Sequence, residues 1–186
     1  MAMLKKRELQ DCHALYELMV HPDVFPFVRQ KASSYEEFLF MTKQLMEAEE
    51  RGELISRTIL DEWGNPIGTI SLFDIQDGAG FLGTWLGKPY HGLGYNRRAK
   101  EAFFHELFYE LSIETVFLRI RKVNVRSIKA AEKLPYVTPA NETRRALLEQ
   151  IGADVYNLYE ITKDNYTLYT MRHPSFAHNE EQRKEA

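Results

Sequence analysis

The sequence predicts an α/β (α+β) fold: a mixed, mostly antiparallel sheet of six to seven strands, flanked by helices, with one central strand–helix–strand crossover. Two observations predict it. Three strand-like runs, 54–60, 67–73 and 81–86, follow one another with only short turns between them, as in an antiparallel meander. A helical run, 95–111, and a further strand-like run, 115–123, come next, so the chain crosses over once before it returns to the sheet.

The segment before the meander is predicted to contain one short strand and two helices. Leu15 and Leu18 share one side of the first helix, and Ser33 with Ser34 predicts the N-cap of the second, amphipathic one. The predicted ranges are 4–9 for the strand, 11–19 and 35–50 for the helices, and 21–28 for a Pro-interrupted aromatic loop, HPDVFPFV.

The segment after the crossover strand is predicted to contain two helices and a hairpin. Pro139 fits the first position of the second helix, and Gly152 fits the position after its end. The predicted ranges are 125–134 and 139–151 for the helices, and 155–161 with 166–171 for a hairpin around the turn KDN.

Length and composition predict one soluble domain. The chain has 186 residues, of which 44% are hydrophobic and 27% charged, and it contains no apolar run of the ~20 residues that a membrane span needs. We expect a single domain over 1–174, a charged and disordered tail over 175–186, and a monomer or homodimer. The single cysteine, Cys12, excludes an internal disulfide framework and a cysteine zinc site, and the basic but not apolar start of the chain predicts a cytoplasmic location.

The charge distribution separates one positive block from an otherwise acidic chain. The net charge of −3 argues against a general nucleic-acid partner. Residues 1–87 carry 8 basic and 14 acidic residues, whereas 88–133 carry 10 basic and 5 acidic ones. A polyanionic ligand at the positive block would explain this, but so would ordinary variation in charge along a chain.

Gly92 and Gly94 stand between the strand-like run 81–86 and the helical run 95–111. Glycine lets backbone approach a ligand, and a helix N-terminus offers unpaired N–H groups, so together they form an anion site; a tight turn is the simpler alternative. A dinucleotide fingerprint would need a third glycine where Arg97 stands, and no Gly-Lys-Ser/Thr tripeptide of a phosphate loop occurs in the chain.

The same stretch resembles the central motif of the GNAT superfamily of acyl-CoA-dependent N-acetyltransferases, Gln/Arg-x-x-Gly-x-Gly/Ala, although Pro89 stands at the Gln/Arg position. HPDVFPFV and GTWLGKPYHGLGYN resemble the subgroup of ribosomal-protein N-terminal acetyltransferases. VNVRSIKAAEKLPY resembles its Asn-x-x-Ser-x-x-x-x-Glu-Lys-Leu-Gly-Phe segment, with Pro135 and Tyr136 in place of Gly-Phe. The resemblance implies a GNAT-like fold over nearly the whole chain, with 139–151 as an extra element.

The resemblance also implies acetyl-CoA as cosubstrate. The pyrophosphate would lie on main-chain amides, and the pantetheine arm would pair with backbone at the strand 81–86. The implied cofactor-binding residues are Trp85, Leu86, Gly92, Leu93, Gly94, Tyr95, Asn96, Asn124, Ser127 and Lys133. Four of them also have a structural alternative: Trp85 as a core residue, Asn124 as a helix N-cap, Ser127 as a first-turn serine and Lys133 as a solvated lysine.

The implied reaction is direct transfer of the acetyl group to a primary amine. Many members use a Glu on the fourth strand as base and a Tyr as acid, but 83–86 contains no Glu and Ala131 stands at the Tyr position. Ser127 and Tyr136 are the remaining candidates for catalytic residues. The histidines have no partners at metal-ligand spacing, so no metal is expected, and a non-catalytic acyl-CoA-binding module is the alternative function.

The acceptor is expected to enter beside the aromatic loop, which contains Phe25 and Phe27. The alternative is that both phenylalanines are core residues. The acidic balance of 1–87 favours a cationic acceptor, because the resemblance places the early helices at the acceptor opening.

Overall fold

The computed structural model describes residues 3–172 and divides them into two compact units. The first unit comprises residues 3–77 and 82–112, and the second comprises 78–81 and 113–172. The predicted tail, 175–186, lies outside the described residues, and the expectation of one domain over 1–174 stays a prediction.

Seven strands form the sheet, in the hydrogen-bonded order β1-β2-β3-β4-β5-β7-β6. They are β1 (Leu4–Lys6), β2 (Ile55–Leu60), β3 (Pro66–Gln76), β4 (Ala79–Leu86), β5 (Thr115–Arg121), β6 (Thr138–Pro139) and β7 (Tyr156–Thr162). β4 and β5 are parallel, with Ala79 opposite Thr115, and β1–β2, β2–β3, β5–β7 and β6–β7 are antiparallel. The prediction of a mostly antiparallel sheet with one crossover is therefore confirmed.

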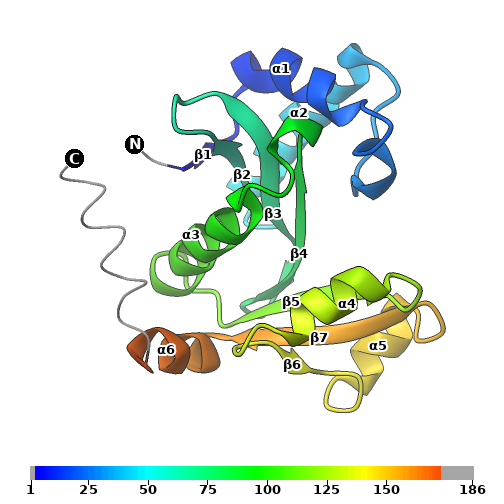
Figure 1. Cartoon of the computed structure of the whole chain (residues 1–186), viewed down its shortest axis with the longest axis vertical. Helices are drawn as coiled ribbons and strands as arrows, with labels where there is room; N and C mark the ends of the chain where they lie inside the picture. Colours follow the sequence, from blue (N-terminus) through cyan, green and yellow to red (C-terminus); the bar gives the residue numbers. More distant parts are fainter. Residues whose placement is uncertain (1–2, 173–186) are drawn as a thin grey trace. The chain divides into compact units, whose positions relative to one another are not determined.

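Three helices belong to the first unit: α1 (Cys12–Met19), α2 (Tyr35–Glu50) and α3 (Tyr95–Tyr109). α3 crosses in front of the strands of this unit and α2 lies behind them (Figure 1). The predicted N-cap of α2 is confirmed, because the Ser34 hydroxyl oxygen accepts the N–H of Glu37 at 3.1 Å. The Glu37 carboxylate in turn accepts the N–H of Ser33 at 3.0 Å, so two N-terminal donors are satisfied reciprocally.

The core of the first unit joins α1, α2 and the loop between them. Buried residues of this cluster include Leu15, Met19, Val28 and Phe38, and the partly buried Trp85 of β4 packs against it. The side chain of Trp85 is thus a packing residue, as the structural alternative for it predicted.

A buried ion network connects β2 with two helices of the first unit. The Arg57 side chain is only 6% exposed and donates to the carboxylates of Glu49 on α2, at 3.1 Å, and Glu106 on α3, at 2.6 Å. Burial lowers the pKa of Arg57, but the two carboxylates outweigh it and hold the pKa above its ordinary value. The guanidinium is therefore permanently charged, and its burial depends on pairing with both carboxylates.

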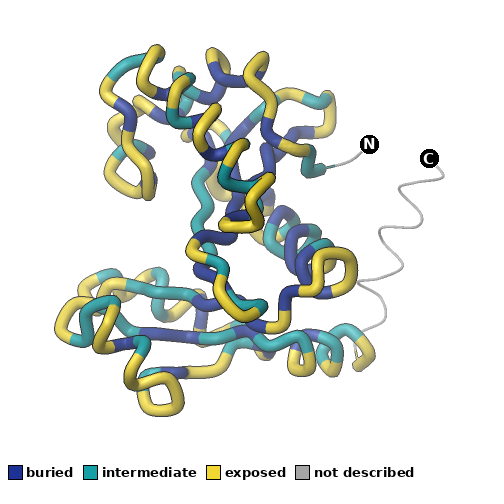
Figure 2. The backbone as a smooth tube through the Cα atoms, turned by 180° about the vertical axis from the view of Figure 1, so that it is seen from behind, coloured by how far each residue is buried: buried dark blue, intermediate teal, exposed yellow. Residues whose placement is uncertain are grey.

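The second unit has its own core between β5, β7 and α5. Phe81 and Phe117 are buried with ring centroids 5.4 Å apart, together with Leu148 and Leu158. Its helices are α4 (Val125–Glu132), α5 (Arg145–Ile151) and α6 (Lys163–Arg172). Buried residues run along the strands of this unit and exposed ones gather in its loops (Figure 2).

The predicted C-terminal hairpin is wrong in its second half, because residues 163–172 form α6 rather than a strand. The Thr162 hydroxyl oxygen accepts the N–H of Asn165 at 3.2 Å, and Asp164 lies in the first turn, where a carboxylate stabilises the helix dipole. Tyr166 is buried, and its ring packs edge-on against Tyr136 at 5.3 Å. The helix α6 thus carries the ring that packs against Tyr136.

The prediction of a helix over 139–151 is wrong in nearly its first half, 139–144. Thr138 and Pro139 pair with β7 instead, and Ala140 continues this contact by donating its N–H to the carbonyl oxygen of Leu158 at 2.8 Å. The Asn141 side chain accepts the N–H of Leu158 at 2.7 Å. Because the free edge of β7 is paired in this way, the helix starts only at Arg145.

Candidate functional site

The loop between β4 and α3, in the first unit, adopts the conformation that its two glycines allow. Gly92 and Gly94 have φ angles of +73° and +84°, in the left-handed region that other residues rarely adopt. A Cβ atom at either position would have no described atom within 4 Å, apart from its chain neighbours. The glycines are therefore required by the turn, and the space beside them is open to a ligand.

The N-terminus of α3 is built to attract an anion. Gly94 is its N-cap and supplies no side-chain hydrogen bond, so the N–H groups of the first turn have no such cap. No acidic residue lies in this first turn, whereas Arg97 and Arg98 do. The missing side-chain cap, the positive end of the helix dipole and two cations, of which Arg97 also pairs with Glu101 at 3.2 Å, favour a phosphate-like group here.

Two side chains fix the loop in place. His91 donates from Nε2 to the carbonyl oxygen of Leu86 at 2.8 Å, since a carbonyl can only accept. The Tyr95 hydroxyl donates to the carboxylate of Glu62, which lies in the turn between β2 and β3. This bond raises the pKa of Tyr95 and lowers that of Glu62, so the tyrosine stays protonated and its carboxylate acceptor stays ionised.

Neither of these two anchors follows from the sequence pattern. Tyr95 was predicted only as a main-chain ligand, and its side chain is buried as an anchor, with the Arg98 guanidinium 4.6 Å from the ring centroid. Glu62 lies in the segment DEWGNP, which gives a turn signal but no sign of this partner.

At Gly83, one of the four positions 83–86 that contain no Glu, β4 has little room for a larger side chain. A Cβ at Gly83 would lie 2.7 Å from the ring of Phe73, closer than real Cβ atoms approach, and 3.8 Å from Cδ of Arg29. The space that a carboxylate side chain would need at this position is filled by these two residues. Packing therefore disfavours a larger side chain at Gly83.

The remaining predicted residues lie in the second unit, on and after α4. The Asn124 side-chain oxygen accepts the N–H of Ser127 at 3.2 Å, which confirms the predicted N-cap. Ser127 is half-buried and Lys133 is exposed. Tyr136 is only 3% exposed, so this catalytic candidate is a core residue of its unit, and its ring packs against those of two further tyrosines, Tyr166 and Tyr169.

The aromatic loop of the first unit separates its two phenylalanines. Phe25 packs partly against the core, whereas Phe27 is 72% exposed. Phe27 is therefore not a core residue, whereas Phe25 is partly buried in the core.

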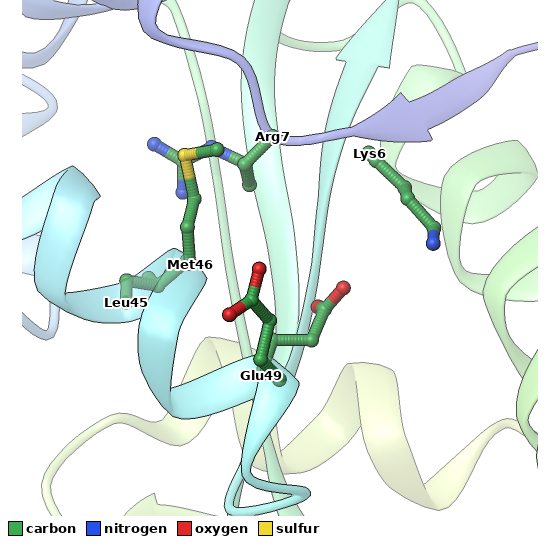
Figure 3. Close-up of a pocket in the computed structure, with 6 residues that line it drawn as sticks. Lys6, Arg7, Leu45, Met46 and Glu49 are labelled. Carbon is green, nitrogen blue, oxygen red and sulfur yellow. The ribbon is translucent and has the colours of Figure 1, made fainter.

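A pocket of about 240 Å³ lies elsewhere in the first unit, between α2 and the chain that follows β1. Figure 3 shows the Glu49 carboxylate pointing toward Arg7. Burial lowers the pKa of Arg7. None of the predicted site residues lines it; the lining residues are Lys6, Arg7, Leu45, Met46, Glu49 and Glu50. The pocket adjoins the ion network of Arg57 and is separate from the loop before α3.

Within residues 3–172, no three His, Cys, Asp or Glu side chains are grouped closely enough to hold a metal ion. In the same part of the chain, every helix is too short or too polar to cross a bilayer.

Comparisons with known proteins agree with this architecture. The sequence model of a family described as "Acetyltransferase (GNAT) domain" matches residues 3–137. No curated protein sequence matches the chain.

Among solved structures, RimL, an alpha-N-protein acetyltransferase of a ribosomal protein, is similar with a TM-score of 0.71 and 18% identity, covering 86% of this chain and 88% of its own. FdhC, a nucleotide-linked sugar GNAT, has a TM-score of 0.72 and 15% identity, covering 92% of each chain. A variant of spermidine N-acetyltransferase SpeG from Vibrio cholerae has a TM-score of 0.67 and 13% identity, covering 89% and 97%. At these low identities, the TM-scores show a shared fold alone.

Proposed function

Because this chain belongs to the GNAT acetyltransferase family, we propose that it transfers an acetyl group directly from acetyl-CoA to a primary amine, on a protein N-terminus or a small molecule. The observation that carries the proposal is the junction of β4 and α3, where two left-handed glycines and an uncapped, cationic helix N-terminus face open space. An N-acetyltransferase needs such an anion site for the pyrophosphate of its cosubstrate.

The amides from Gly92 to Asn96 would bind the pyrophosphate, and the main chain at Trp85 and Leu86 would pair with the pantetheine arm. Main-chain groups suit this role because the side chain of Trp85 packs in the core and that of Leu86 is buried. A backbone N–H directed at the thioester oxygen would stabilise the charge that develops there, an effect worth ~3 kcal/mol for one donor.

The reaction needs a neutral acceptor amine. Its nitrogen attacks the thioester carbon, the carbon–sulfur bond breaks, and the CoA thiolate leaves and takes up a proton. An N-terminal amine, with a pKa near ~8, needs less help from a base than a lysine-like amine near ~10.4. Cys12 is fully buried on α1, which supports transfer without an acyl-cysteine intermediate.

The test is thiol release from acetyl-CoA in the presence of a panel of primary amines, with calorimetric binding of acetyl-CoA measured beside it. Amine-dependent thiol release is the expected result. Binding of acetyl-CoA without release on any amine would show a binding module instead.

Asn124→Asp is expected to weaken acetyl-CoA binding about tenfold, or ~1.4 kcal/mol, while the melting temperature stays unchanged. The aspartate keeps the oxygen that caps Ser127 but loses the amide donor that we assign to the pantetheine arm, and it adds a negative charge. Calorimetry and thermal melting measure the two effects. Asn124→Ala is the control, since it removes cap and donor together; equal binding by Asn124→Asp and the wild type would leave Asn124 with the capping role alone.

Phe27→Ala is expected to raise the Michaelis constant of the acceptor severalfold and to leave acetyl-CoA affinity and stability unchanged. The side chain is 72% exposed, so its loss leaves no cavity, and exposed substitutions rarely change stability by more than ~0.5 kcal/mol. Steady-state kinetics beside thermal melting checks this. Phe25→Ala is the matched comparison and should lower the melting temperature, because Phe25 packs against the core. An unchanged Michaelis constant for Phe27→Ala would remove the aromatic loop from the acceptor site.

A further inference from the structure

Arg29, which follows the aromatic loop, is fixed beside β4 in the first unit. Its guanidinium carbon lies 4.2 Å from the centroid of the Phe73 ring, and Nη2 lies 2.7 Å from Oδ2 of Asp74. Cδ of Arg29 would be 3.8 Å from a Cβ atom on Gly83. A cation therefore stands on the face of β4 that carries Gly83, the strand to which the proposed function assigns the thioester.

The arginine is held before any ligand arrives. Its side chain is 26% exposed and stacked on the buried ring of Phe73, so little side-chain entropy remains to be lost on binding. Asp74 is 69% exposed, which makes its carboxylate accessible to water. An exposed ion pair of this kind is weak enough for a second anion to compete with it.

Three acidic residues of the early helices already have partners. Glu37 caps α2 through Ser33, Glu49 pairs with Arg57, and Glu17 lies 3.7 Å from His13. The acidic balance of residues 1–87 therefore does not describe the charge beside Gly83, where the nearest charged side chain is Arg29.

A second cation, Lys31, follows the aromatic loop. The Lys31 ammonium donates to the carbonyl oxygen of Val28 at 2.9 Å and lies 6.0 Å from the centroid of the Phe25 ring. Asp23, the acid of this loop, is already paired with Lys88 at 3.2 Å. Aromatic rings and cations thus stand together where the acceptor is expected.

We propose that Arg29 binds an oxyanion carried by the acceptor itself, so that the substrate is a primary amine that also bears a carboxylate or a phosphate. This inference rests on the proposed function. A guanidinium pairs with a carboxylate or phosphate through two parallel N–H donors, which fixes the orientation of the acceptor as well as its affinity. A polyamine, whose charges are all positive, is a poor substrate for this arrangement.

The test compares acceptors that differ only in the anion. Gly-Phe is compared with Gly-Phe amide, which has the same N-terminal glycine, and aminoethyl phosphate is compared with ethanolamine; spermidine is the polyamine reference. In each pair the Michaelis constant is measured by thiol release above the pKa of the amine. We expect it to be at least about tenfold lower for the anionic member of one pair, which also identifies carboxylate or phosphate as the ligand.

Three variants connect this preference to Arg29. Arg29→Gln should abolish the ratio of Michaelis constants without changing acetyl-CoA affinity, and Arg29→Lys, which keeps the charge, should retain part of it. Asp74→Asn should increase the ratio severalfold, because it removes the competing carboxylate and because asparagine tolerates the φ of +53° at this position. Arg145→Gln, on the exposed surface of α5, is the control and should change nothing.

Arg29→Lys and Asp74→Asn keep the test decisive if Arg29→Gln fails to fold. Acetylation of spermidine or of the neutral amines with equal or lower Michaelis constants would overturn the inference and leave the acetyltransferase activity standing. A ratio that persists in Arg29→Gln would overturn it too. Absence of thiol release with every amine would overturn the proposed function together with this inference.

Discussion

Gly94→Val is expected to weaken acetyl-CoA binding about 100-fold, or ~2.7 kcal/mol. No described atom lies within 4 Å of a Cβ at Gly94, so the new side chain meets open space rather than protein, and this is the space that we assign to the pyrophosphate. A branched side chain there blocks the approach of phosphate to the N–H groups of α3. Isothermal titration of acetyl-CoA measures the loss.

Backbone strain must be separated from this steric effect, because valine is also unfavourable at the φ of +84°. Gly52→Val is the matched control: Gly52 follows α2, has a φ of +76° and likewise has no described atom within 4 Å of a Cβ. Both variants should lose similar stability in thermal melting, but only Gly94→Val should lose affinity. If Gly52→Val loses as much affinity, or if Gly94→Val binds normally, the phosphate loop is wrongly assigned.

Arg57→Met is expected to lower the free energy of unfolding by about 3 kcal/mol, the largest stability effect that we predict for a single substitution in the first unit. Methionine fills much of the same volume, so the loss comes from two partly buried carboxylates, Glu49 and Glu106, that are left without their cation. Urea denaturation followed by circular dichroism measures it.

Arg51→Met is the matched control, since Arg51 also makes two hydrogen bonds to a glutamate, Glu53, but both side chains are more than half exposed. Water screens this pair, so we expect a much smaller change in the free energy of unfolding than for Arg57→Met. Equal losses in the two variants would mean that burial gives the Arg57 network no more influence on stability than a surface ion pair has.

The sequence by itself determined the features whose causes are local. The cap at Ser34 depends on a hydrogen bond three residues along the chain, and so does the cap at Asn124. Gly92 and Gly94 predict a turn, because only glycine adopts the positive φ angles of this turn without cost. Hydrophobic periodicity predicted the helix 35–50 and the three strands of the meander, because side-chain burial repeats with the period of the backbone, but it did not predict β6.

The tertiary structure decided what depends on distant partners. Residues 163–172 fit a strand or a helix by pattern, and the helix prevails where Tyr166 packs against Tyr136, 30 positions earlier. The anchor between Glu62 and Tyr95 joins residues 33 positions apart, and Arg29 meets Asp74 across 45. None of these pairs joins two strand residues, so each depends on how helices and loops pack onto the sheet. A local sequence pattern contains no information on that packing, so the charge beside Gly83 became visible only in the folded chain.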